Sequence, residues 1–155
     1  MPEKDEQHEG RELLARISNE MVRAQKRYFG KGPTSAKSYM LDDLLIIVMR
    51  GSMTTAEHTL VDFDRADAVR DFRQTFENEM TERLTDMVEE LTGRKVLTYQ
   101  SQILFEPDMV VELFVFDKPV AEHLRGATGH GQIEDDSVGE ATDDDALDAE
   151  VGKGQ

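Results

Sequence analysis

Two stretches of the chain place apolar side chains at the period of an α-helix. Between residues 10 and 29 they recur at three- and four-residue steps, which puts them on one helical stripe. The same spacing forms a heptad seam, but about two heptads are few for a coiled coil, and packing on a sheet is the favoured use. The longer stretch runs from Ala66 to Thr92 and ends at Gly93, a residue suited to close a helix. The stripes are Leu14, Ile17, Met21, Ala24 and Tyr28, then Val69, Phe72, Phe76, Met80, Leu84, Met87, Val88 and Leu91.

Four shorter segments have the composition of β-strands. The second and fourth are apolar almost without alternation, which is typical of strands covered on both faces or buried in a dimer. Turn residues separate the members of each pair: Asp42-Asp43 in the first and Glu106-Pro107-Asp108 in the second. We therefore expect strands at residues 35–41, 43–50, 95–105 and 109–117.

A short helix at residues 55–63 is predicted from a capping box, because Glu57 follows Thr54 by three residues. The order helix, hairpin, helix, helix, hairpin indicates an α+β domain at residues 10–119, with a four-stranded, mainly antiparallel sheet and the helices packed on one face. Residues 1–9 are charged and predicted to fray. Residues 120–155 form an acidic tail with few large apolar groups, and we expect this tail to be disordered.

The net charge of −15 is unevenly distributed over the 155 residues. Residues 131–155 hold nine acids against one lysine, a net charge of −8 that leaves −7 for the preceding residues. This sign repels phosphate backbones, so we expect no nucleic-acid partner. The chain has no cysteine and no apolar run near the ~20 residues that span a bilayer, and its first residues are too charged for a signal peptide. We expect a cytoplasmic protein that does not itself cross the membrane.

The loop Gly30-Lys31-Gly32-Pro33-Thr34 invites an anion-binding interpretation, because glycine backbones let amides approach an anion and the lysines neutralise it. It is not a phosphate-binding loop of the Walker type, since it leads into a strand. The alternatives are a plain helix-terminating turn and a partner contact. For the arginines near this loop, the simplest interpretation is that they lie on a solvent-exposed face or form intramolecular ion pairs. The hypothetical ligand- or anion-binding residues are Lys31, Gly32, Thr34, Lys37, Arg50 and Arg73.

Other candidate chemistry is weaker. The carboxylates at Asp62, Asp64 and Asp67 fail the calcium-loop spacing, and His58 has no histidine within a helical turn. Asp42-Asp43 is most simply a turn. No nucleophile and base can be paired, so we predict no catalytic residues, no metal, no cofactor and no enzyme activity.

An ordered set of residues across positions 10–117 has recognisable spacings. The set is Gly30-Lys-Gly-Pro33-Thr34, Lys37, Tyr39, Asp42-Asp43, Gly51, Thr54, Glu57, Leu60, Val69, Arg73, Phe76, residues 89–96, Pro107-Asp108 and residues 112–115. Together these residues resemble the MpsC family, also called the YbcI family. The resemblance implies a small soluble protein without an established biochemical activity, named for a membrane system that moves cations or inorganic carbon. Asp62-Phe63-Asp64 departs from the family pattern, where small or glycine-containing residues are expected.

Two functions follow as expectations. The first is a homodimeric, non-enzymatic accessory or regulatory protein of a membrane transport system, bound peripherally to the inner membrane through a transporter subunit. The alternative is a sensor of a small anion or ligand that uses the Gly30–Lys37 loop and nearby arginines. The surplus of apolar strand residues favours a homodimer over a monomer.

Overall fold

The computed structural model describes residues 2–133 and has the α+β class predicted from the sequence. Two long helices and one short helix accompany a five-stranded antiparallel sheet. The elements are α1 (Pro2–Phe29), β1 (Ser35–Met40), β2 (Leu44–Arg50), α2 (Thr55–Asp62), α3 (Ala66–Thr92), β3 (Val96–Leu104), β4 (Met109–Phe116), the 3₁₀ helix η1 (Glu122–Leu124) and β5 (Thr128–His130).

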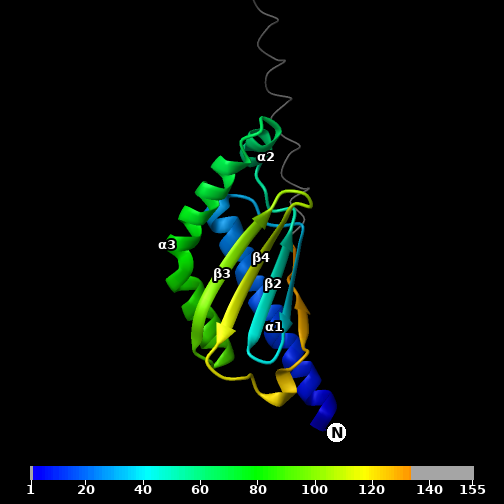
Figure 1. Cartoon of the computed structure of the whole chain (residues 1–155). Coiled ribbons are helices and arrows are strands. Elements are labelled where there is room, and N and C mark those ends of the chain that lie inside the picture. The colour runs from blue at the N-terminus through cyan, green and yellow to red at the C-terminus, as the bar shows by residue number, and fades with distance from the viewer. Residues whose placement is uncertain (1, 134–155) are drawn as a thin grey trace, which may run out of the picture.

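The sheet has the strand order β3-β4-β2-β1-β5, and α1 and α3 lie on one of its faces (Figure 1). No described element lies over the other face (Figure 1). The prediction of strands covered on both faces is therefore not met within residues 2–133. In β2, Leu45, Ile47 and Met49 are buried, whereas Leu44 and its alternate neighbours are only partly covered. The alternation of burial follows from the pleat, which sends successive side chains to opposite faces.

The predicted four-stranded sheet is wrong by one strand, because β5 pairs with β1 at the far edge. β5 has only three residues and no apolar pattern, so its sequence gives no strand signal. Close backbone packing holds it: a Cβ added at Gly129 would lie 2.2 Å from the backbone nitrogen of Ala15 in α1. Ser18 of α1 donates a hydrogen bond to the Gly129 carbonyl at 3.0 Å. The predicted disordered tail thus includes a folded segment, and residues 134–155 of that tail lie outside the described part.

The N-terminal prediction also needs correction. Residues 2–9 continue α1 instead of fraying before it, although their side chains are exposed. Glu3 and Asp5 in the first turn suit the positive end of the helix dipole, and this is the physical reason for the extension. The predicted stop of α3 is present: Gly93 takes a left-handed conformation with φ 68°.

Candidate functional site

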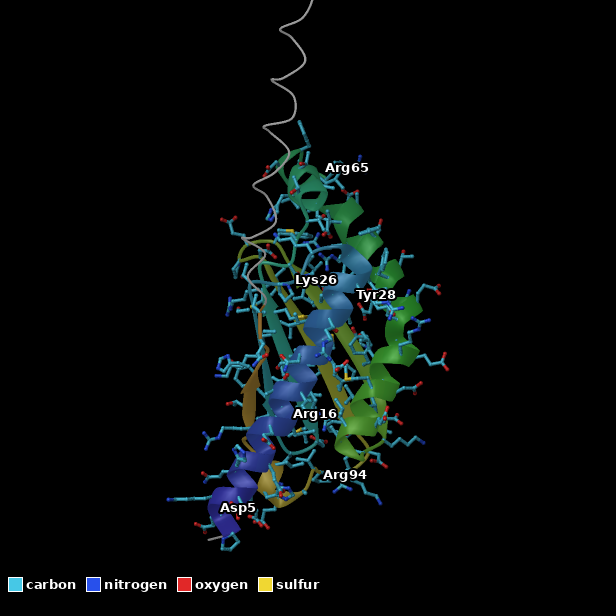
Figure 2. The ribbon with its side chains drawn as sticks, turned by 180° about the vertical axis from the view of Figure 1, so that it is seen from behind. Asp5, Arg16, Lys26, Tyr28, Arg65 and Arg94 are labelled. Atoms are coloured by element: carbon cyan, nitrogen blue, oxygen red, sulfur yellow. The ribbon has the colours of Figure 1, made fainter. Side chains whose placement is uncertain are left out.

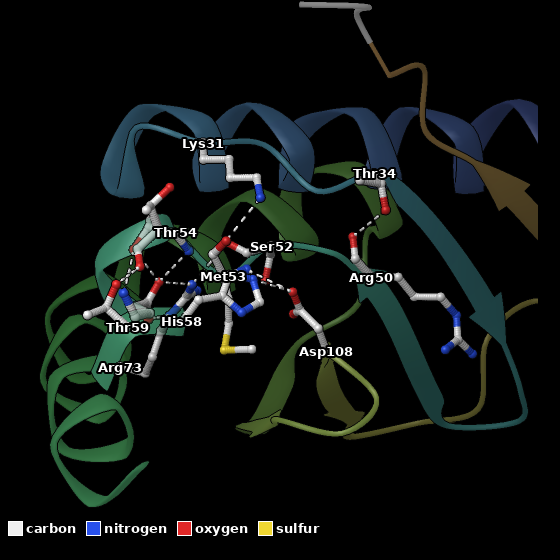
Figure 3. Close-up of polar contacts among 12 residues, drawn as sticks. Lys31, Thr34, Arg50, Ser52, Met53, Thr54, His58, Thr59, Arg73 and Asp108 are labelled. Atoms are coloured by element: carbon white, nitrogen blue, oxygen red, sulfur yellow. Dashed lines mark hydrogen bonds and ion pairs between the residues drawn. The ribbon is translucent and has the colours of Figure 1, made fainter. Parts of the chain in front are cut away.

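The loops at one end of the sheet meet at a junction that hydrogen bonds hold together (Figure 3). Lys31 donates a hydrogen bond from Nζ to the Met53 carbonyl at 3.0 Å. Asp108, in the turn between β3 and β4, accepts from the Gly51 amide at 3.1 Å through its carbonyl and from the Met53 amide at 3.4 Å through Oδ2. The loop after α1 is thereby tied to the loop after β2, which is tied in turn to the β3–β4 turn.

A buried ion pair anchors α2 and α3 to this junction. The Arg73 guanidinium donates to both carboxylate oxygens of Glu57, from Nε at 2.6 Å and from Nη2 at 2.7 Å, and Arg73 is only 8% exposed. Its remaining contacts are the Gln25 side chain, the Ser52 carbonyl and the ring of Phe29, 3.9 Å below the guanidinium carbon. Arg73 is therefore neutralised and held on several sides.

Glu57 both pairs with Arg73 and caps the N-terminus of α2. Its carboxylate accepts from the Thr54 amide at 3.0 Å, and the Thr54 hydroxyl accepts from the Glu57 amide, which is the capping box predicted from the sequence. Burial acts to raise the pKa of Glu57, but the hydrogen bonds and charge of Arg73, together with Thr54, bring the pKa below its ordinary value.

The structure does not gather the sequence-predicted ligand residues into one pocket. Lys37 and Arg50 lie on the uncovered face of the sheet, where the Lys37 ammonium sits 4.9 Å from the centre of the Tyr39 ring. Thr34 uses its hydroxyl on the Arg50 carbonyl at 3.1 Å. Arg73 lies on the opposite, helix-covered side. Lys31 and Gly32 remain in the loop itself, with Lys31 occupied by Met53 as described and Gly32 next to α1.

The uncovered face carries a row of aliphatic side chains along its two central strands. The register pairs Leu44 with Val115, Ile46 with Leu113, and Val48 with Val111. All six are half-buried by their neighbours alone. Polar or amphipathic residues flank them on the two neighbouring strands: Lys37 and Tyr39 on β1, and Gln100 and Gln102 on β3. We call this surface the open sheet face.

On the other side of the sheet, a cavity of ≈ 230 Å³ lies between α1, α3 and the inner face of β3 and β4. Its lining combines apolar walls with carboxyl, hydroxyl and amide groups, and exposed residues of α3 and β3 border it. We call it the Glu112 cavity. Its lining residues are Gln25, Phe29, Arg70, Asp71, Arg73, Gln74, Glu77, Met80, Tyr99, Ser101, Gln102, Ile103, Val110 and Glu112.

Glu112 is the unusual member of this lining. It is 2% exposed, and its Oε1 accepts a hydrogen bond from the Ser101 hydroxyl at 3.0 Å, while Oε2 has no hydrogen-bond partner among the described residues. Glu77 of α3 approaches the same serine, since its Oε1 accepts from the Ser101 amide at 3.1 Å. Two carboxyl groups therefore flank one serine.

The titration behaviour of these groups follows from their surroundings. Burial raises the pKa of Glu112 to about 7, with the negative charge of Glu77 adding to the effect and the hydroxyls of Tyr99 and Ser101 and the charge of Arg73 opposing it. Burial also raises the pKa of Glu77. Burial and the neighbouring Glu112 raise the pKa of Tyr99, which stays protonated near neutral pH.

The sequence analysis named Glu112 only as part of the family resemblance and proposed none of Glu112, Glu77, Tyr99 and Ser101 as a site residue. A signal for Glu112 was present: in the strand Met109–Phe116, a period of two places Glu112 on the same face as Val110 and Phe114. A carboxylate on the apolar face of a strand is a candidate for function or for a buried partner. Nothing in the sequence alone indicates that Glu77, 35 positions earlier, meets the same serine.

These features define an α+β domain with a helical layer on one side of its sheet, an open apolar face on the other and a carboxyl-lined cavity between the layers. In a comparison with known protein families, residues 9–118 match the family described as "Na+-translocating membrane potential-generating system (MpsC)". The chain belongs to this family, as its sequence resemblance predicted.

Two relatives from Bacillus subtilis (strain 168) are themselves uncharacterized. The protein YbcI is 26% identical over 92 residues, 59% of this chain and 74% of the relative. YrhF is 25% identical over 107 residues, 67% of this chain and 88% of the relative. No solved structure matches the chain. Within residues 2–133, no helix has the length and apolar character needed to cross a bilayer.

Proposed function

We propose that this protein is a non-enzymatic accessory or regulatory component of a membrane system that transports cations or inorganic carbon, and that it acts by protein–protein contact. The observation that carries the proposal is membership of a family described as a Na⁺-translocating, membrane-potential-generating system. The protein works in the cytoplasm as a homodimer, peripheral to the inner membrane through a transporter subunit.

The open sheet face supports a second copy of the chain as its occupant. The eight residues of β4 give a length of ~27 Å, and four strands give a width of ~19 Å. Stacking two such faces removes about 500 Å² per copy from water, or about 1,000 Å² in all, the lower end of specific interfaces. An apolar strip of this size favours burial over exposure.

The pattern of residues on the open sheet face is self-complementary. A two-fold axis parallel to the strands, between β2 and β4, places each β2 over β4 of the second copy. In the row that contains Val48 and Val111, this arrangement sets valine on valine and Lys37 over Gln102, so no like charges meet. Two sheets stacked face to face in this way pack as a β-sandwich.

The helical side then remains for a membrane partner (Figure 2). Helix α3 carries eight acids against three arginines, one of which is neutralised by Glu57. Cytoplasmic loops of membrane proteins carry an excess of lysine and arginine, and their charge complements this helix. The expected contact is electrostatic and weakens as salt rises.

The dimer is tested by light scattering coupled to size exclusion. Leu113→Glu, at the centre of the open sheet face, is expected to convert the full chain to a monomer, because a carboxylate cannot be buried opposite apolar side chains without a partner. Leu60→Glu on α2, whose native side chain is 38% exposed, is the matched control and leaves the dimer intact. A wild-type chain that is monomeric at micromolar concentration contradicts the dimer.

The accessory role is tested by affinity capture from a membrane fraction of the native host, followed by mass spectrometry, with chains that end at residue 133 or include the acidic tail. The expected result is recovery of an ion-transporting membrane subunit that dissociates as salt rises. Recovery of no transporter subunit with either chain counts against the proposal.

The second candidate function is a small-ligand sensor, but the Glu112 cavity supports it better than the Gly30–Lys37 loop does. The anion version on the Gly30–Lys37 loop is weakened, because Arg73 is neutralised by Glu57 and lies across the sheet from Lys37 and Arg50. The Glu112 cavity favours a ligand of the opposite charge.

A further inference from the structure

The Oε2 atom of Glu112 has no hydrogen-bond partner among the described residues, and Glu112 lines a cavity that is partly open to solvent. A buried carboxylate normally finds donors for both oxygens, because an unpaired charge in a protein interior is costly. The hydroxyls of Ser101 and Tyr99 both stabilise the Glu112 carboxylate, with Ser101 donating to Oε1, but Oε2 has no hydrogen-bond partner among the described residues. Since Glu112 is 2% exposed, bulk water does not compensate for the missing donor. The cavity it lines, of ≈ 230 Å³, is large enough to admit the group that supplies one.

The charges around the cavity do not cancel within the chain. Arg73 is the buried cation of the lining and is paired with both oxygens of Glu57, so its charge lowers the pKa of Glu112 but does not offset the rise caused by burial. The other arginine of the lining, Arg70, is exposed and lies over the Phe105 ring, 4.8 Å from its centre. Neither Glu77 nor Glu112 forms an ion pair with a described residue. The inner part of the cavity therefore has two carboxyl groups in excess, both at Ser101.

The walls of the cavity suit an organic molecule. Phe29 and Tyr99 present aromatic rings, and Met80, Ile103 and Val110 present aliphatic surface. Apolar walls of this kind bind a short carbon chain. The volume is below the usual range for drug-sized ligands, which limits the occupant to a few non-hydrogen atoms.

We propose that the Glu112 cavity is a binding site for a small organic cation, a primary ammonium or guanidinium compound, whose N–H groups donate to Oε2 of Glu112 and to the Glu77 carboxylate. Phe29, which lies under Arg73, and Tyr99, which stacks on Phe114, contribute apolar surface beside the carbon chain of the ligand. This site goes beyond the accessory role and does not depend on it.

Two other occupants fit less well. Among residues 2–133 there is no group of three or more histidine, cysteine, aspartate or glutamate side chains that could hold a metal ion. A bare alkali ion would also leave most of the cavity and its apolar walls without contacts. An anion would face the two carboxyl groups, and of the two arginines in the lining Arg73 is paired with Glu57 and Arg70 is exposed.

The pH dependence of binding follows from the groups that face Glu112: Glu77 and Arg73 from α3, Tyr99 and Ser101 from β3, and the neutral Gln25 from α1. A cation needs the ionised carboxylate, and the pKa of Glu112 is about 7. Affinity should rise as the pH approaches 7 and flatten above it. Below that pH, binding should release a proton.

The test is isothermal titration calorimetry of the full chain with four probes: propylammonium chloride, methylguanidinium chloride, sodium chloride and sodium acetate. The two organic cations are expected to bind, more tightly at pH 8 than at pH 6, with heats that depend on buffer ionisation at the lower pH. Glu112→Gln keeps the shape and is expected to weaken binding by at least about tenfold, as for loss of a hydrogen bond to a charged group.

Glu82→Gln, at an exposed position of α3 outside the cavity, is the matched control and should bind as the wild type does. Glu77→Gln provides a second variant, expected to weaken binding by a smaller factor. The proposal is overturned if neither organic cation binds, if sodium binds as tightly as they do, if acetate binds, or if Glu112→Gln retains full affinity. Because the dimer is measured separately, failure here leaves the accessory role untouched.

Discussion

Replacing Glu112 by glutamine should stabilise the protein, and increasingly so as the pH rises from 5 to 8. The carboxyl group has a pKa of about 7 in the folded chain against an ordinary value of 4.5. The folded state therefore keeps the proton over a pH range in which the unfolded state has lost it. Stability from this group is fully present below pH 4.5 and is lost as the pH rises through 7.

The magnitude follows from the difference between the two pKa values. A difference of about 2.5 units at ~1.36 kcal/mol per unit gives about 3 kcal/mol of destabilisation at pH 8. Glutamine carries no charge at any pH, and its amide can occupy the place of the protonated carboxyl. For a chain of this length, the variant should unfold about 6–12 °C above the wild type at pH 8 and close to it at pH 5.

Urea denaturation and differential scanning calorimetry at several pH values measure this difference. Groups that are present in both proteins largely cancel in the comparison. The contribution of Glu57 to stability cancels as well, because Glu57 is present in both proteins. Its pKa is lowered, so the stability it contributes is present above its ordinary pKa of 4.5 and is lost at lower pH. Glu82→Gln should show no pH-dependent difference. A stability difference that is independent of pH, or a glutamine variant less stable than wild type at pH 8, would refute the argument.

Two further changes test how the layers are joined. Arg73→Met leaves the Glu57 carboxylate buried without its cation and should cost about 3–5 kcal/mol by urea denaturation, whereas the exposed Arg70→Met should cost under about 1 kcal/mol. Equal losses for the two variants would contradict the ion-pair interpretation. Gly129→Ala places a Cβ 2.2 Å from the Ala15 nitrogen and should lower the free energy of unfolding by about 1–3 kcal/mol. Hydrogen exchange of backbone amides should become faster in β5 and its neighbour β1 alone, and unchanged exchange there would contradict the packing argument.

The elements with long periodic patterns could be predicted from the sequence. α3 shows its stripe over 27 residues and ends at a glycine that the structure places in the left-handed conformation. The capping box at Thr54 was readable because both of its partners lie within three residues. Local signals of this kind depend on neighbours in the sequence, and the folded chain retains them.

Features that depend on tertiary contacts were not predicted. β5 is a strand because Gly129 lets its backbone approach α1 and because β1 offers an unpaired edge. Neither condition appears in the three residues of the strand. Similarly, Arg73 was a candidate anion ligand with an intramolecular ion pair as the default, and the structure shows an ion pair whose partner, Glu57, lies 16 positions away on another helix and was not predicted. A cation on a helix cannot be assigned to a ligand or to an internal carboxylate until the facing element is known.

Glu112 shows how the two kinds of information combine. The pleat of β4 sends its side chain inward with Val110 and Phe114, where an apolar residue would pack without an unpaired oxygen. A sequence selected for stability alone has no physical reason to place a carboxyl group there, since glutamine is expected to be more stable at neutral pH. Local choices that conflict with the surrounding core concentrate at functional sites. The conflict at Glu112, together with the cavity beside it, therefore favours binding over packing as the reason for this residue.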